Sequence, residues 1–262
     1  MLELALLMRN FFRKFSQWFL DWLFNRRPQA IPLKWGGYVK RVVVLFITWF
    51  LLYQIWILIH IAWWVKFNPT STAFMQTRLV ELRIENPRAE LEHYWIDYAK
   101  MSNNLKLAVI ASEDAKFLQH QGFDWGGIEY AIKKNVKQGK LVAGGSTITQ
   151  QLAKNLFLSS NRSLFRKFQE VIIAVMLEQV LSKQRIYEIY LNVIEWGNGV
   201  FGAEAAARHY YNKGARSIST TQAAKLAAMV PNPRFYDAHR NTTYLNRRIA
   251  TIKARLPLVK AP

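Results

Sequence analysis

The hydrophobic pattern divides the chain into one long apolar run followed by a series of amphipathic segments. Residues 42–65 carry no formally charged side chain over 24 positions. A helix of that length measures roughly 36 Å, enough to cross a ~30 Å hydrocarbon core with some tilt. Trp63 and Trp64 stand near one end, as tryptophans of an interfacial belt do. The run predicts one transmembrane helix; a buried core helix is the alternative.

Cations on either side of the run predict its orientation. Lys34, Lys40 and Arg41 precede the run closely, whereas only Lys66 follows it closely. Because short cytoplasmic flanks of membrane helices are enriched in Lys and Arg, the N-terminus is predicted to be cytoplasmic. The rest of the chain would then lie outside, which in a bacterium is the periplasmic face of the inner membrane.

This orientation divides the chain into three parts: a cytoplasmic segment 1–41, the span 42–65 and an exported domain 66–262. Within the first 25 residues, apolar side chains recur at helical spacing, with Arg9 and Arg13 between them. This pattern predicts either an amphipathic helix on the inner leaflet or a helix docked on a partner protein.

The exported part shows helical periodicity almost throughout. Asp124 is a plausible N-cap for a helix that stops at Gly139, and Thr147 with Gln150 has the spacing of a capping box. No strand alternation is long enough to predict a strand, so we expect a mainly α-helical domain. Further helices are expected over residues 103–118, 165–182, 182–196, 202–211, 220–230 and 245–256.

Composition narrows the chemistry. The chain has no cysteine, which excludes disulfides, thiol catalysis and cysteine metal sites. The formal net charge of +19 favours an anionic partner such as nucleic acid, anionic lipid or a phosphorylated substrate.

Three stretches carry candidate chemistry, each with an ordinary structural alternative. Glu113 and Asp114 end an apolar run, "LKLAVIAS". The stretch "GGSTITQQLAKN" (144–155) places hydroxyls, amides and Lys154 together, but it also suits a simple capped helix. "RSLFRKFQE" (162–170) places two arginines and Glu170 at i,i+4 spacing, which suits a pyrophosphate site or a row of surface ion pairs.

The order of the motifs carries more information than any one of them. "EDAKFLQHQG", "GGSTITQQ", "RKFQE" and "KQRIYEIYLN" resemble the four main motifs of the peptidoglycan glycosyltransferases, the enzymes that polymerise lipid II. "RRIATIKARL", with Arg247, Arg248 and Ile252, resembles the weaker fifth motif. The likeness covers roughly residues 80–256. Because the chain has no Ser-x-x-Lys, it resembles the monofunctional form, without a penicillin-sensitive transpeptidase.

The resemblance implies a fold and a reaction. The fold would be a lysozyme-like all-α domain with a smaller membrane-facing lobe. The enzyme would join the 4-hydroxyl of lipid II to the anomeric carbon of a lipid-linked glycan, with inversion, to form a β-1,4 bond and release undecaprenyl pyrophosphate. Its partners would be lipid II, the lipid-linked glycan, the membrane and cell-division or other cell-wall synthesis proteins, and not nucleic acid.

The resemblance also implies roles for residues. Glu113 would be the general base, partly desolvated at the end of its apolar helix. Glu170 would be the second essential carboxylate, which either holds Mg²⁺ or Mn²⁺ beside the pyrophosphate or orients the neighbouring cations; no organic cofactor is implied. The expected substrate contacts are Ser146, Thr147, Gln150, Gln151, Lys154, Arg162, Arg166 and Lys167.

Five further residues are expected to support the site. Asp114 lies about 100° round a helix from Glu113, so the two acids should not face one substrate atom. One histidine on a turn, His120, is expected to make structural hydrogen bonds. The supporting set is Asp114, His120, Lys183, Tyr190 and Asn192.

Aromatic residues around the candidate base leave two interpretations open. Phe117, Phe123, Trp125 and Ile128 would either form a lobe that enters the bilayer or belong to the core.

Two other functions compete with glycan synthesis. A lytic or hydrolytic enzyme of the same fold would need no cationic cluster for pyrophosphate. A basic, non-enzymatic envelope scaffold, or one that captures nucleic acid, would carry dispersed cations or a basic tail. Here Lys154, Arg162, Arg166 and Lys167 alternate with acids and hydroxyls, which favours glycosyl transfer.

Overall fold

The computed structural model describes residues 13–14, 17, 20–21, 35–139, 144–158 and 163–262. The chain divides into two compact units, Met1–Trp56 and Ile57–Pro262. The amphipathic helix expected within the first 25 residues lies almost entirely outside the described residues.

The long apolar run forms the helix α2 (Trp35–Trp63). Within it, Gly37–Trp63 is long and apolar enough to cross a membrane. This confirms the expected apolar helix, although the helix begins before residue 42 and ends before residue 65. Large apolar side chains along it are exposed, among them Val42 and Ile59, at 65% and 61%. Such exposure is typical of a lipid-facing helix and not of a core helix.

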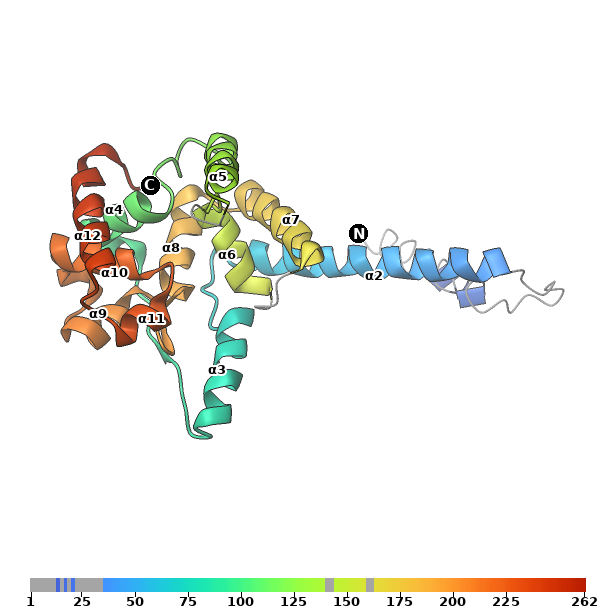
Figure 1. Cartoon of the computed structure of the whole chain (residues 1–262). Helices are drawn as coiled ribbons and strands as arrows, with labels where there is room; N and C mark the ends of the chain where they lie inside the picture. The colour runs from blue at the N-terminus through green and yellow to red at the C-terminus, as the bar shows by residue number, and fades with distance from the viewer. Residues whose placement is uncertain (1–12, 15–16, 18–19, 22–34, 140–143, 159–162) are drawn as a thin grey trace, which may run out of the picture. The chain divides into compact units, whose positions relative to one another are not determined.

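The second unit is an all-α domain with one very small sheet (Figure 1). Its α-helices are α3 (Ala73–Glu85), α4 (Asn103–Glu113), α5 (Trp125–Gln138), α6 (Ile148–Phe157), α7 (Leu164–Val180), α8 (Lys183–Val193), α9 (Ala203–Tyr211), α10 (Thr220–Met229), α11 (Pro233–Ala238) and α12 (Thr243–Arg255). Short 3-10 turns are η1 (Tyr98–Lys100), η2 (Ala215–Ser217) and η3 (Leu256–Leu258).

Two helix clusters form the body of this unit. In the first, α4 packs against α10 and α12. In the second, α6 packs against α3, α7 and α8. Alanines at buried positions of α9 and α10, such as Ala206 and Ala227, let neighbouring backbones approach closely. The two clusters bring the end of α4 beside the start of α6, where the candidate base lies.

The sheet joins three strands of two or three residues each. β3 (Val200–Phe201) lies between β1 (Glu92–His93) and β2 (Glu195–Gly197), parallel to the first and antiparallel to the second. Segments this short show no alternation, so the sequence pattern did not predict them. The strand β2 also ends the helix expected over 182–196 early, because α8 stops at Val193.

Capping residues set the helix starts near the site. The Asp124 side chain accepts from the Gly127 N–H, and Gly139 ends α5 in the left-handed conformation at φ 62°. Thr147 and Gln150 make the expected capping box at the start of α6. The helix α3, whose N-cap is Thr72, was not predicted from the sequence.

Candidate active site

Glu113 is the last residue of α4, and its side chain is only 8% exposed. Leu105, Val109 and Ile110 bury the other face of this helix, which fixes the direction in which its end projects. Asp114 follows at the C-cap with φ −160° and ψ 76°. The helix therefore ends between the two acids, and the side chains of Glu113 and Asp114 bind different partners.

Three groups contact the Glu113 carboxylate. One oxygen, Oε1, lies 2.9 Å from Ser112 Oγ and 3.3 Å from Arg248 Nη2. The other, Oε2, accepts a hydrogen bond of 3.2 Å from Gln151 Nε2. The Gln151 carbonyl in turn accepts a bond of 2.9 Å from the Tyr190 hydroxyl. A chain of side-chain hydrogen bonds thus runs from α8 through α6 to the end of α4.

Tyr190 anchors that chain from the core. Its side chain is fully buried, and burial, together with the negative charge of Glu113, raises its pKa well above the ordinary value. The phenol therefore stays protonated and remains a donor to Gln151. Gln151 can then donate its amide N–H to Glu113, because its oxygen is already engaged.

Asp114 has a different function in the fold. Its Oδ2 accepts from the Ile148 N–H at 3.1 Å, at the first turn of α6. His120 Nε2 lies 3.0 Å from Oδ1. The carboxylate of Asp114 therefore joins the end of α4, the His120 turn and the start of α6. His120 makes the structural hydrogen bond that was expected of it.

The Ser-Thr-Gln stretch separates into structural and accessible side chains. Thr147 and Gln150 are each 3% exposed and are engaged in the capping box. Thr147 also donates a 2.6 Å bond to the Gly122 carbonyl. Ser146, by contrast, is exposed. The structure thus gives Thr147 and Gln150 the role of shaping the loop, and leaves Ser146 and Gln151 facing open space.

Two cavities flank the Glu113–Gln151 contact. The base cavity, about 190 Å³, is lined by the segments Glu113–Lys116 and Gly144–Thr147 together with Asp124 and Gly127. The cation cavity, about 340 Å³, is lined by Gln151, Lys154, Asn155, Arg166, Arg234 and the turn Val230–Pro233, with Glu195 in its wall. Glu113 lines the first cavity, Gln151 lines the second, and one hydrogen bond joins the two side chains.

Cations in the cation cavity come from three helices, and Arg234 is the contribution of α11. Lys154 lies in the last turn of α6, and Arg166 lies in the first turn of α7. Arg166 Nε is buried with no hydrogen-bond partner among the described residues. An unpartnered guanidinium N–H in a cavity wall is a ready donor for an anion. Arg162, the other expected cation, lies outside the described residues.

Glu170 lies behind these cations. It is 4% exposed, accepts a 2.5 Å bond from Lys167 Nζ, and lies 3.9 Å from Arg166 Nη1. This geometry supports the second of the two expected roles, the orientation of cations. The described part of the chain contains no group of three His, Cys, Asp or Glu side chains that could hold a metal ion. A metal ion held by Glu170 would therefore need the pyrophosphate itself as a further ligand, and the metal stays a prediction.

The remaining supporting residues lie further from the cavities. Lys183 pairs with Glu178 at 2.8 Å and lies over the Phe117 ring. Asn192 is fully buried, and its amide binds the backbone of Ile96. Both residues thus stabilise the scaffold, and neither lines the base cavity or the cation cavity. Motif membership alone could not distinguish them from Tyr190, which does reach the site through Gln151.

Two residues at the site were given no role in it from the sequence. Arg248 belongs to the weak fifth motif, and its contact with Glu113 spans 135 positions of chain. Arg234 follows Pro233, which looked only like a helix breaker but is the first residue of α11. Neither position has a local signal that would place it beside Glu113 or Lys154.

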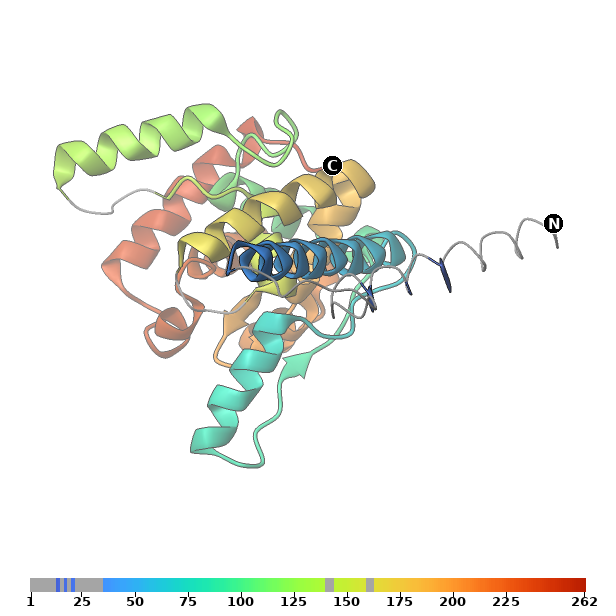
Figure 2. The same cartoon turned by 90° about the vertical axis from the view of Figure 1, so that its right-hand side faces the viewer.

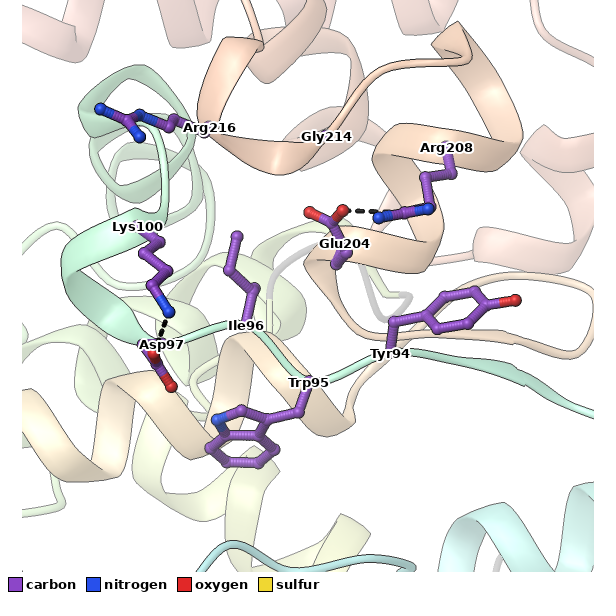
Figure 3. A pocket seen from close by; sticks show the side chains of 9 residues that line it. All are labelled: Tyr94, Trp95, Ile96, Asp97, Lys100, Glu204, Arg208, Gly214 and Arg216. Carbon is purple, nitrogen blue, oxygen red and sulfur yellow. Dashed lines mark hydrogen bonds and ion pairs between the residues drawn. The ribbon is translucent and has the colours of Figure 1, made fainter.

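Figure 3 shows a separate cavity of about 530 Å³ between the Tyr94–Lys100 segment and α9. Two ion pairs lie in its wall, Lys100 with Asp97 at 2.8 Å and Arg208 with Glu204 at 2.8 Å. None of the residues expected at the active site lines it. Glu113, Gln151 and Arg166 line the other two cavities.

Comparison with known proteins agrees with this geometry. The model of the Transglycosylase family matches residues 81–256, which include Glu113, Gln151, Lys154, Glu170 and Arg248. The chain belongs to the transglycosylase family. This family match begins within α3 and ends at the last residue before Pro257, so it covers the whole lining of the base cavity and all of the cation cavity except Phe74.

Similar curated proteins cover nearly the whole chain. A relative from Methylobacillus flagellatus is 58% identical over 88% of this chain and 98% of its own length. One from Chromobacterium violaceum is 58% identical over 85% of this chain and 97% of its own, and one from Laribacter hongkongensis is 58% identical over 88% and 100%. Each of these relatives is named a biosynthetic peptidoglycan transglycosylase.

Proposed function

We propose that this transglycosylase polymerises peptidoglycan glycan strands from lipid II at the outer face of the cytoplasmic membrane. The observation that carries the proposal is the pair of cavities joined at Glu113 and Gln151. One cavity offers a carboxylate to a hydroxyl. The other offers cations to a leaving pyrophosphate.

In the proposed reaction, Glu113 takes the proton of the acceptor 4-hydroxyl as that oxygen attacks the anomeric carbon of the donor. A new C–O bond forms, the bond from that carbon to the pyrophosphate oxygen breaks, and the configuration inverts. Ser112, Gln151 and Arg248 hold the carboxylate in one orientation, so little reorganisation is needed when the hydroxyl arrives. Asp114 keeps the start of α6 beside it.

Departure of the pyrophosphate depends on charge neutralisation. Lys154 and Arg166 line the cation cavity, and Glu170, paired closely with Lys167, lies 3.9 Å behind Arg166 and attracts it toward that wall. Preorganised cations stabilise charge that develops on a leaving group. In the proposed mechanism these cations neutralise the charge that develops on the pyrophosphate. A lytic enzyme would have no use for such a cavity, and a scaffold would not need a buried carboxylate next to it.

The membrane is the source of the substrate. On α5 and α7, apolar side chains face outward: Trp125 is 73%, Val136 78% and Leu164 92% exposed. Phe165, Phe168 and Val175 continue this exposed apolar surface along α7, and Figures 1 and 2 show both helices at the outside of the domain. A surface of this kind suits a bilayer. Phe117, in contrast, is fully buried and belongs to the core. The aromatic residues near Glu113 therefore divide between the two interpretations.

The test is a polymerisation assay with the full-length chain. Purified enzyme in detergent or vesicles is given labelled lipid II, and products are followed as glycan length and as undecaprenyl pyrophosphate. We expect both to rise together. Shorter fragments without new polymer would show that the enzyme cuts glycan; no turnover of lipid II by folded enzyme would refute the proposed activity. A reporter fused after residue 262 should be active only in the periplasm, and cytoplasmic activity would refute the orientation.

A further inference from the structure

A further cavity lies beside the cation cavity, along α3. This α3 cavity, about 400 Å³, is lined by Arg78, Glu81, Leu82, Ile84, Glu85, Asn198 and Arg234. Phe74, at the start of α3, lines the cation cavity, and residues of its last two turns line the α3 cavity. One helix therefore forms a wall of both, and it projects from the body of the domain in both views (Figures 1 and 2).

Arg234 lies at the junction, because it lines both cavities. Its side chain is 53% exposed. Its Nη1 is 3.8 Å from Glu81 and its Nε is 3.9 Å from Glu195, so both distances exceed hydrogen-bond length. Among the described residues it makes ion pairs at these distances but no hydrogen bond. The five N–H donors of its guanidinium remain available to a ligand.

Arg78 explains why Arg234 is held so loosely. Arg78 is 4% exposed, donates a 3.0 Å bond to Glu195 and also binds Glu81 and Asn198. Both carboxylates near Arg234 therefore already have a cationic partner. Arg234 is kept at the junction by the remaining attraction, and an incoming carboxylate can engage it without breaking a close ion pair.

The lining of the α3 cavity suits a saccharide that carries an acidic group. Glu81, Glu85 and Asn198 offer acceptors for sugar hydroxyls, while Leu82 and Ile84 offer apolar surface. Arg234 offers the planar fork that binds carboxylates in bidentate fashion. The donor of a polymerase is a chain whose sugars continue away from the reacting carbon, so a neighbouring cavity of this composition lies where the next unit must go.

We propose that the α3 cavity binds the second saccharide unit of the growing glycan, with Arg234 pairing to a carboxylate on the peptide of that unit. The inference rests on the proposed polymerase function and adds a subsite to it. Most of α3 precedes residue 81, where the family match begins. The subsite retains the donor chain between additions, because a second contact makes re-engagement of the reacting end effectively intramolecular.

The first coupling provides an internal reference for this proposal. When two lipid II molecules join, the donor has no second saccharide unit, and the α3 cavity plays no part. Every later coupling has one. Loss of the subsite must therefore shorten the polymer more than it slows the first coupling.

The experiment compares variants of the full-length enzyme on labelled lipid II. The first-coupling rate is measured from early tetrasaccharide, and mean glycan length from gel separation. For Arg234→Ala we expect mean length to fall about three- to tenfold, from the loss of one charge-assisted contact, with a smaller loss in the first coupling. The matched control is Arg83→Ala, because Arg83 is an exposed arginine of α3 that lines neither cavity and, within the described parts of the chain, donates a hydrogen bond to the Ala89 carbonyl alone. It should change neither quantity.

A pair of substitutions at Ile84 tests the sign of the charge. Ile84 is 79% exposed, so neither Ile84→Glu nor Ile84→Lys should affect folding. The glutamate should shorten the glycan by repelling the acidic peptide, and the lysine should not. Lipid II whose peptide carboxylates are amidated should give short glycan with the wild-type enzyme and reduce the effect of Arg234→Ala.

The outcomes separate the subsite from the polymerase itself. If wild-type enzyme polymerises lipid II but Arg234→Ala leaves glycan length unchanged, the subsite is refuted and the polymerase stands. Equal losses of first coupling and length would place Arg234 among the cations of the leaving group and also refute the subsite. If the wild-type enzyme makes no polymer, both proposals fail.

Discussion

The active site consists of two regions that are built differently. The floor, where α4, α6 and α8 meet, contains buried or half-buried side chains whose polar atoms are engaged: Glu113, Asp114, Gln151 and Tyr190. The rim, where α6, α7 and α11 meet, contains more exposed cations. Lys167 is 48% exposed, and Arg234 is 53% exposed without a hydrogen bond among the described residues.

The difference corresponds to what each region must do. Proton transfer requires one geometry, and buried hydrogen bonds hold a carboxylate within a few tenths of an ångström. Pyrophosphate arrives and departs, so its cations must exchange one anion for another. Loose pairs such as Arg166–Glu170, at 3.9 Å, allow that exchange at low cost. Substitutions in the floor should therefore affect proton transfer, and substitutions in the rim should affect the neutralisation of the pyrophosphate charge.

The largest effect is expected at the centre of the floor. Glu113→Gln keeps the shape of the side chain and the fold, and it removes the group that accepts the proton. We expect polymerisation to fall about 100- to 10,000-fold, the usual contribution of a general base. Turnover of labelled lipid II measures this loss, and circular dichroism and lipid II binding serve as controls. A folded Glu113→Gln that polymerises at the normal rate would refute the assignment of the base.

A smaller but still heavy loss is expected at the rim. Lys154→Ala removes a cation from the cavity of the leaving group, and such a loss in a transition state costs about 2.7–4 kcal/mol, or 100- to 1000-fold in rate. The same substitution at Lys133, whose Nζ pairs with Glu129 on the exposed face of α5, should leave the rate unchanged. Initial rates at several salt concentrations provide the measurement. If the two variants behaved alike, the pyrophosphate would have to bind elsewhere.

Some features of this site could be predicted from the amino-acid sequence, and others could not. The caps at Asp124 and Thr147 and the pairing of Glu170 with Arg166 follow from local spacing, because each involves residues within one or two turns. The end of α4 does not, because its helix was expected to continue to residue 118 but stops at Glu113. The mainly α architecture and the apolar α2 follow from periodicity. These features needed no knowledge of how distant helices pack.

Contacts between residues far apart in the sequence could not be predicted in this way. Arg248 contacts Glu113 because α12 packs on α4, and no sequence pattern near either residue predicts that contact. Asn192 and Tyr190 lie two positions apart on α8, yet one binds the Ile96 backbone and the other Gln151. The strands β1 to β3 are too short to show alternation, and they form because α8 and α9 bring Glu195–Phe201 beside Glu92.

The smallest effect on rate is expected at the second acid of the floor, which separates positioning from chemistry. In Asp114→Asn the side chain keeps an oxygen that can accept from the Ile148 N–H, so the start of α6 should stay in place. It loses the charge that faces His120, and a weakened bond of this kind costs about 1–3 kcal/mol of stability.

We therefore expect Asp114→Asn to lower the free energy of unfolding while its rate at 25 °C stays within about tenfold of wild type, since Glu113 keeps its contacts with Gln151 and Arg248. Chemical denaturation and lipid II turnover are measured on the same preparations as for Glu113→Gln. Glu113→Gln should show the opposite pattern, with stability kept and rate lost. If Asp114→Asn were folded and the less active of the two, the proton would pass to Asp114. The hydrogen bonds of Glu113 to Ser112, Gln151 and Arg248 would then serve only to position a bystander.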